Sequence, residues 1–194
     1  MTHLSAIYSK YLSSEKMLAV VSDEALIEKM IRFETSLAST QQKLGIIRSS
    51  AAEAVVQVLN TTKVKPTDLA EGTLRNGIPV IPLLAIFREK LSEDTKEFLH
   101  YGATSQDTLD TAQILVVSDA IRLLSKMLDD FKNNLEKLDK TYGVTRCMGR
   151  TRGQLAVPIT FGLRINSWMQ PVNRQQQRLK ELSTRLLKVQ MGGA

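Results

Sequence analysis

The stretch from Thr104 to Tyr142 contains neither glycine nor proline, and it constrains the fold more than any other feature of the sequence. Its apolar residues recur in steps of three and four, which is the period of an α-helix with one apolar face. A second stretch with this period runs from Pro158 to Leu186; Pro158 suits the first turn of a helix, and Pro171 is expected to kink it. The apolar positions of the first stretch are Leu109, Ala112, Val116, Ala120, Leu124, Met127, Phe131, Leu135 and Leu138.

Two helices of this kind, each roughly 50 Å long at 1.5 Å per residue, cannot bury their apolar faces against each other alone. The sequence therefore predicts a larger helical bundle, completed by sequence outside these residues or by other chains. The first hundred residues have the pattern of short helices, and no segment alternates long enough to indicate a sheet. We predict an all-α fold, with a small N-terminal helical domain at residues 1–102 and the first two long helices of a central bundle at 103–194. The short helices are expected at Glu24–Leu44, at Ala51–Leu59, from Thr67 onward and at Leu83–Leu91, with an irregular Gly/Pro loop at Gly72–Pro82.

The composition excludes several functional classes. A single cysteine, Cys147, excludes an internal disulfide and a Cys-x-x-Cys site, and with His3 and His100 as the only histidines no metal site is expected. No apolar run approaches the ~20 residues that cross a bilayer, so we expect no membrane partner. The first residues lack the pattern of a secretory signal, which favours a cytoplasmic location.

Charge is distributed unevenly along the chain. Residues 141–194 hold nine basic residues and one acid, a net charge of +8, although the whole chain carries only +6. Such a segment indicates an anionic partner: a polyanionic substrate, an acidic face of another subunit, or nucleic acid. Nucleic acid is not expected, because the segment has few aromatic residues to stack on bases and no common reader motif.

A polar cluster at His100–Asp107 precedes the first long helix. One interpretation is a capping box formed by Thr104 and Asp107, which needs no ligand. The other is an anion site, because a helix start presents unpaired N–H groups and the positive end of the helix dipole. Capping does not require His100 or Gln106, which favours the anion site, and the two interpretations are compatible.

A second polar segment, Met148–Gly162, lies between the long helices. Arg150 and Arg152 have planar, permanently charged side chains suited to carboxylates, and Thr151 and Gln154 add neutral donors. Taken alone, the segment is more typical of a solvated loop. Together with His100–Asp107, it gives the chain two regions suited to binding anions.

The two segments resemble the first two conserved regions of the fumarase/aspartase superfamily. The first match is HYGATSQDxxDTA from His100, and the second is GRTxxQxAxPxTFG from Gly149. The GATSQD motif and the C-terminal residues GGA are most similar to the bacterial 3-carboxy-cis,cis-muconate cycloisomerase branch. The resemblance covers the chain from near Ala6 to Ala194 and corresponds to about the N-terminal half of a family member.

The resemblance implies an all-α homotetramer around a central bundle, with active sites shared between subunits and no cofactor. Its members stabilise a carbanion or enediolate next to a carboxylate, and the cycloisomerase adds a substrate carboxylate across a double bond to close a lactone. By position, His100 and Ser105 are the candidate catalytic residues of this chain. The candidate substrate-binding residues are Asn76, Thr104, Ser105, Gln106, Arg150, Thr151, Arg152 and Gln154.

Two departures from the family pattern bear on activity. Related adenylosuccinate and argininosuccinate lyases have histidine where this chain has Arg152, and a permanently charged guanidinium is a poor acid or base near neutrality. We therefore assign Arg152 to binding substrate charge. The family's third region, a GSSxMPxKxNP loop with the catalytic serine, does not occur in these residues, so the chain alone is expected to be inactive. An adenylosuccinate-type lyase fragment and a non-catalytic helical interaction module are the alternatives.

Overall fold

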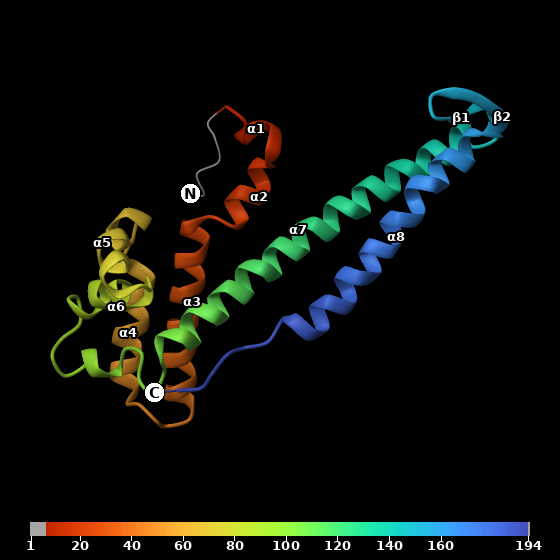
Figure 1. The fold of residues 1–194 in the computed structure, drawn as a ribbon. Coiled ribbons are helices and arrows are strands. Elements are labelled where there is room, and N and C mark those ends of the chain that lie inside the picture. Colours follow the sequence, from red (N-terminus) through yellow and green to blue (C-terminus); the bar gives the residue numbers. More distant parts are fainter. Residues whose placement is uncertain (1–6, 194) are drawn as a thin grey trace. The chain divides into compact units, whose positions relative to one another are not determined.

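The computed structural model describes residues 7–193, and helices dominate it (Figure 1). The predicted all-α class is confirmed, with one addition, a two-stranded hairpin between the long helices. His3, Ala194 and the first six residues of the predicted N-terminal domain lie outside the described residues. The elements are α1 (Ser9–Leu12), α2 (Glu15–Val20), α3 (Asp23–Lys43), α4 (Ser49–Thr61), α5 (Pro66–Asn76), α6 (Val80–Arg88), the 3-10 helix η1 (Lys96–Phe98), α7 (Ser105–Tyr142), β1 (Arg146–Thr151), β2 (Gln154–Thr160) and α8 (Phe161–Leu186).

The chain divides into two compact units, and α7 contributes to both. Unit 1 contains residues 7–120 together with the C-terminal segment 187–193. Unit 2 contains residues 121–186. The predicted domain boundary after residue 102 stays a prediction.

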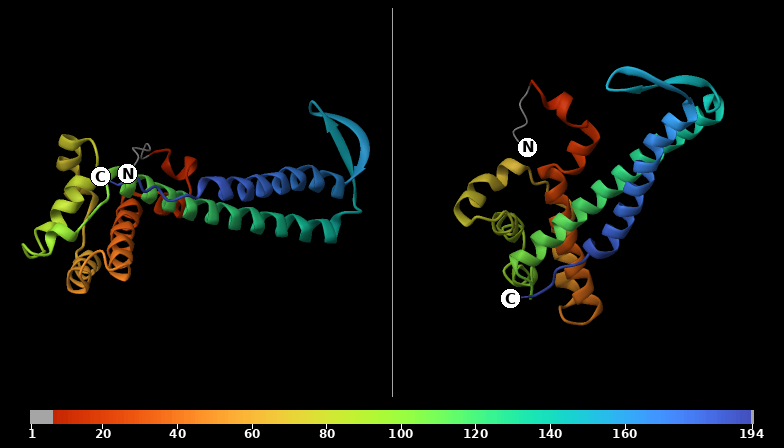
Figure 2. Two further views of the ribbon diagram at one scale, coloured as in Figure 1. Left: turned by 90° about the horizontal axis from the view of Figure 1, so that it is seen from below. Right: turned by 45° about the vertical axis from the view of Figure 1, so that its right-hand side comes forward.

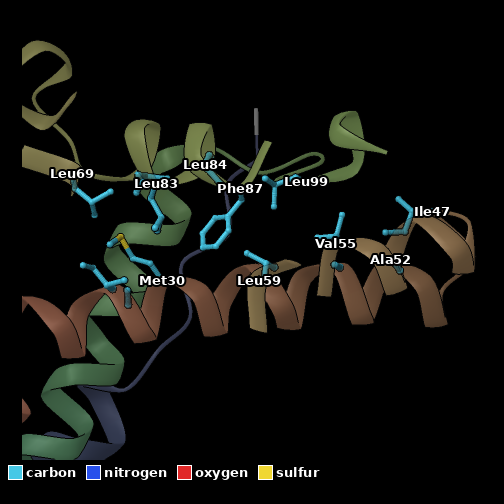
Figure 3. Packing of buried hydrophobic residues seen from close by; sticks show 14 residues of the cluster. Met30, Ile47, Ala52, Val55, Leu59, Leu69, Leu83, Leu84, Phe87 and Leu99 are labelled. Atoms are coloured by element: carbon cyan, nitrogen blue, oxygen red, sulfur yellow. The ribbon is translucent and has the colours of Figure 1, made fainter. Parts of the chain in front are cut away.

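Unit 1 has a closed apolar core formed mainly by α3, α4, α5 and α6. Helix α3 begins where the Ser22 hydroxyl accepts a hydrogen bond from the Ala25 N–H group at 3.1 Å. Figure 3 shows Leu83 and Phe87 of α6 facing Met30 of α3 and Leu59 of α4. Met30, Leu83 and Phe87 are fully buried, so these helices form a core within the unit itself.

The predicted irregular loop at Gly72–Pro82 is wrong. Helix α5 continues to Asn76 and ends at Gly77, whose φ of 74° is the left-handed conformation that glycine adopts readily. Helix α6 begins soon after, at Val80. A side chain on Gly72 would collide with the Pro82 ring, so Gly72 permits close packing of α5 on α6 within a helix, where the sequence suggested a loop.

Unit 2 consists of the C-terminal part of α7, the β1–β2 hairpin and α8. The strands pair antiparallel from Arg146 with Thr160 to Thr151 with Gln154, which leaves a two-residue turn. Both turn residues, Arg152 and Gly153, have positive φ values, 46° and 82°, as type I′ hairpin turns require.

The hairpin corrects two predictions for the segment between the long helices. The prediction that Pro158 lies in the first turn of the second long helix is wrong, because Pro158 lies in β2 opposite Met148 and α8 begins only at Phe161. The lack of strand-like alternation predicts no sheet, and this prediction is also wrong. Six of the seven β2 residues are exposed, so neither face of the hairpin imposes the alternation on which that inference depended.

Within unit 2, α8 and the C-terminal part of α7 lie side by side in all views (Figure 2). Leu135, Ile165 and Val172 are buried, and the Gln176 amide donates to Asp129 Oδ1 at 2.5 Å. Many large apolar side chains of this unit nevertheless remain in contact with solvent. We call seven of them the exposed apolar set: Leu124, Met127, Phe131 and Leu138 of α7, and Leu163, Trp168 and Leu182 of α8.

Candidate functional site

The first candidate region is the start of α7, in unit 1. The Thr104 N–H group donates to the Asp107 carboxylate at 3.0 Å, which is half of the predicted capping box. The other half differs, because the Asp107 N–H group donates to the Thr104 carbonyl and not to its hydroxyl. Within residues 7–193, the hydroxyl groups of Thr104 and Ser105 make no hydrogen bond, and both residues are half-buried. These hydroxyls therefore remain available to a ligand.

Asp107 binds the C-terminal segment as well as the helix start. Its side chain is completely buried and accepts hydrogen bonds from the N–H groups of Gly192 and Gly193 at 2.7 and 2.9 Å. One turn further, Thr111 exchanges hydrogen bonds with the backbone of Gln190. Burial acts to raise the pKa of Asp107, but the N–H donors of Gly192, Thr104 and Gly193 outweigh it and hold the pKa below its ordinary value of 3.8. No pattern in the sequence predicts this long-range role of Asp107.

The His100 side chain is bonded to an acid of α3. Its Nδ1 atom lies 2.7 Å from the carboxyl oxygen Oε1 of Glu34, which also accepts a hydrogen bond from the Thr108 hydroxyl at 2.8 Å. Sequence reasoning missed Glu34 and Thr108. A signal existed, since Glu34 is an acidic residue next to Phe33 on a helix whose other buried residues are mostly apolar.

The loop before α7 is also held through its backbone. The Gln41 amide donates to the Tyr101 carbonyl at 2.7 Å, so α3 supports both His100 and Tyr101. Gln106 is exposed and donates to Asp110 on its own helix. Asn76, the remaining candidate of unit 1, is exposed at the end of α5 and donates to the Gly72 carbonyl. The structure thus brings His100, Thr104, Ser105 and Gln106 together, whereas no contact of Asn76 with them is present among the described residues.

The second candidate region is the hairpin tip in unit 2. The side chains of Arg150, Thr151, Arg152 and Gln154 are all exposed, and the tight turn brings them together. Between residues 7 and 193, the only hydrogen bond that these side chains make runs from Arg150 to the Gly153 carbonyl, at 3.3 Å. Two guanidinium groups and two neutral polar groups are therefore available to an anion.

The described part of the chain contains no group of three or more histidine, cysteine or acidic side chains that could hold a metal ion. It also contains no helix that is both long enough and apolar enough to span a membrane. The chemistry that these residues offer is hydrogen bonding and positive charge directed at an anion.

Comparisons with known proteins identify the family of this chain. A family model described as "Lyase" matches residues 2–194. The chain is 32% identical over 179 residues to the adenylosuccinate lyase of Methanocaldococcus jannaschii. The aligned region covers 92% of this chain and 39% of that protein. The chain is also 32% identical over 196 residues to the 3-carboxy-cis,cis-muconate cycloisomerase of Acinetobacter baylyi, covering 98% and 44%.

A solved structure shows the same likeness. The 3-carboxy-cis,cis-muconate lactonizing enzyme of Pseudomonas putida superposes with a TM-score of 0.89 at 29% identity, covering 97% of this chain and 44% of that one. The chain therefore spans about two fifths of the length of the relatives that it matches.

Proposed function

Because the chain belongs to the lyase family of the fumarase/aspartase superfamily, we propose that it carries substrate-binding parts of an enzyme that acts on a small polycarboxylate. The observation that carries this proposal is the start of α7. Two hydroxyl groups that have no hydrogen-bond partner among residues 7–193, those of Thr104 and Ser105, lie at the N-terminus of a 38-residue helix. Free hydroxyls and the positive end of a helix dipole favour a carboxylate.

In this proposal, the residues of each region have defined roles. Thr104 and Ser105 bind a substrate carboxylate, Gln106 lines the site, and His100 moves a proton at a substrate carbon. Arg150, Thr151, Arg152 and Gln154 bind further carboxylates, and Asn76 contributes in the assembled enzyme. Donors fixed before the reaction stabilise the negative charge that develops in the transition state.

The specific reaction that we propose is the lactonisation of 3-carboxy-cis,cis-muconate, a step of aromatic catabolism. The GATSQD motif and the similarity to the Acinetobacter baylyi cycloisomerase support this reaction. The whole enzyme would be a cytoplasmic homotetramer with shared active sites and no cofactor. Its exposed apolar set supports assembly with other chains.

Adenylosuccinate lyase activity is the second candidate, because the Methanocaldococcus jannaschii lyase is equally similar to this chain. Arg152 weighs against it. Its side chain lies at an exposed hairpin tip, and a permanently charged guanidinium is poorly suited to act as a general base near neutral pH.

A binding experiment tests the proposal. Amide NMR signals of Thr104 and Ser105 are expected to shift on titration with 3-carboxy-cis,cis-muconate and to shift less with adenylosuccinate. The substitution T104V should weaken binding about tenfold, the cost of one hydrogen bond to a charged group. The matched control is T141V, at the far end of the same helix, which should leave binding unchanged.

The chain is expected to bind without turnover, because these residues lack the catalytic-serine loop of the family. Measurable lactonisation by the 194-residue polypeptide would contradict that expectation. Equal affinity for 3-carboxymuconate and a neutral analogue would contradict the carboxylate site itself.

A further inference from the structure

A buried acid on α3 lies directly behind His100. The Glu34 side chain is only 1% exposed, and its Oε1 atom is within hydrogen-bond distance of both His100 Nδ1 and the Thr108 hydroxyl. The second oxygen, Oε2, is buried without a partner in residues 7–193. Burying a carboxyl group with one oxygen unsatisfied costs free energy that an apolar residue of similar shape would avoid. Stability alone therefore does not account for Glu34.

The backbone of His100 carries a second cost. Its φ of 64° is in the left-handed region, which is unfavourable for a residue with a side chain. The next residue is held in place by Gln41, through the Tyr101 carbonyl. The unusual backbone at His100 and the unsatisfied acid behind its ring thus occur at the same candidate catalytic residue, which is where strain tends to be retained for function.

We propose that Glu34 is a positioning residue for His100, an inference that rests on the proposed function. Two donors converge on Glu34 Oε1: the Thr108 hydroxyl and the Nδ1–H group of His100. The carboxylate thereby holds the imidazole ring in one orientation and in one tautomer, with its proton on Nδ1. The other ring nitrogen, Nε2, then carries the lone pair and can take up a proton from water. When the substrate carboxylate adds across the double bond, Nε2 can deliver this proton to the neighbouring carbon, and the ring returns to its neutral form.

The tautomer can be measured without substrate by nitrogen-15 NMR of the imidazole rings of the 194-residue chain near neutral pH. His3 is the only other histidine, and the variant H3Q identifies the His100 signals. We expect Nδ1 to be protonated and Nε2 to be unprotonated in the wild type. E34Q keeps an accepting oxygen and should keep this tautomer, whereas E34M removes it and should lose the single-tautomer signal.

A second pair of variants covers the case in which E34M does not fold. T108V removes, with little change of shape, the hydroxyl that fixes the Glu34 carboxylate from the side of α7. The carboxylate can then rotate away from His100, so a second tautomer should become detectable. The matched control is T111V, which alters another buried threonine of α7 that bonds to Gln190 and not to Glu34. It should leave the His100 spectrum unchanged.

The outcomes separate this inference from the proposed function. A proton on Nε2 in the wild type, or an unchanged tautomer in folded E34M or T108V, would overturn the role of Glu34. If the tautomer is as expected but 3-carboxymuconate does not bind, the proposed function fails and the role of Glu34 in orienting His100 stands.

Discussion

The two candidate regions for anion binding differ in how far the chain itself organises them. At the start of α7, Glu34 and Asp107 are buried and hold the loop through hydrogen bonds to residues distant in sequence. At the hairpin tip, the side chains of Arg150 and Arg152 are exposed. Among the described residues they make one hydrogen bond, from Arg150 to the Gly153 carbonyl. The first region is therefore preorganised within one chain, whereas the side chains of the second are scarcely held by the described residues.

The packing of the two units shows the same contrast. Unit 1 buries residues as large as Phe87 and Met30 completely. Unit 2 exposes Phe131 and Trp168, each at 48%. Exposed apolar residues at helical spacing indicate surface that other chains cover, so we expect unit 2 to depend on assembly and unit 1 to be stable without it.

Loss of assembly is the largest effect that we expect. The substitution F131E places a charge in the exposed apolar set and should reduce self-association at least tenfold, because each buried aromatic contributes about 1.5–3 kcal/mol. Sedimentation velocity over a range of concentrations measures it. N133E, which adds the same charge at an exposed position outside the set, is the control. If the wild-type chain stays monomeric at every concentration, the expectation that unit 2 depends on assembly is wrong.

Loss of the Asp107 carboxylate comes next in size. The substitution D107A leaves the N–H groups of Thr104, Gly192 and Gly193 without their acceptor, and it should lower the free energy of unfolding by about 3 kcal/mol. Urea denaturation measures the change. The control is D130A, which removes an acid of α7 from an exposed pair with Lys126 and should leave the urea midpoint unchanged. Equal effects of the two substitutions would show that the α7 start is not preorganised.

Long periodic segments were predictable from the sequence, whereas long-range partners were not. The predicted helix from Thr104 to Tyr142 corresponds to α7, because periodicity over many turns determines which face is buried. The hairpin was missed because its exposed strands carry no alternating pattern. The partners of His100 and Asp107 lie 66 and 85 or more positions away, and the spacing within each motif contains no information about them.

A smaller effect on the free energy of unfolding is expected when acid protonates Asp107. Because the pKa of Asp107 is lower in the folded chain than its ordinary value, its ionisation stabilises the fold above about pH 4, the unfolded pKa. This contribution is lost as the pH falls through the lower, folded pKa. The difference in unfolding free energy between wild type and D107N should be constant near neutrality and should shrink below about pH 4. A difference that grows on acidification would contradict the assigned direction.

The smallest effect concerns the hairpin turn, and its sign is opposite to that of D107A. Arg152 has a φ of 46°, a conformation that costs a non-glycine residue about 1 kcal/mol. R152G should therefore stabilise unit 2 by up to about 1 kcal/mol in thermal unfolding, while G153A, at a φ of 82°, should destabilise it by a similar amount. If Arg152 binds substrate charge, R152G should also weaken 3-carboxymuconate binding although it stabilises the fold. A more stable R152G chain with undiminished binding would show that the strained arginine serves neither the fold nor the substrate.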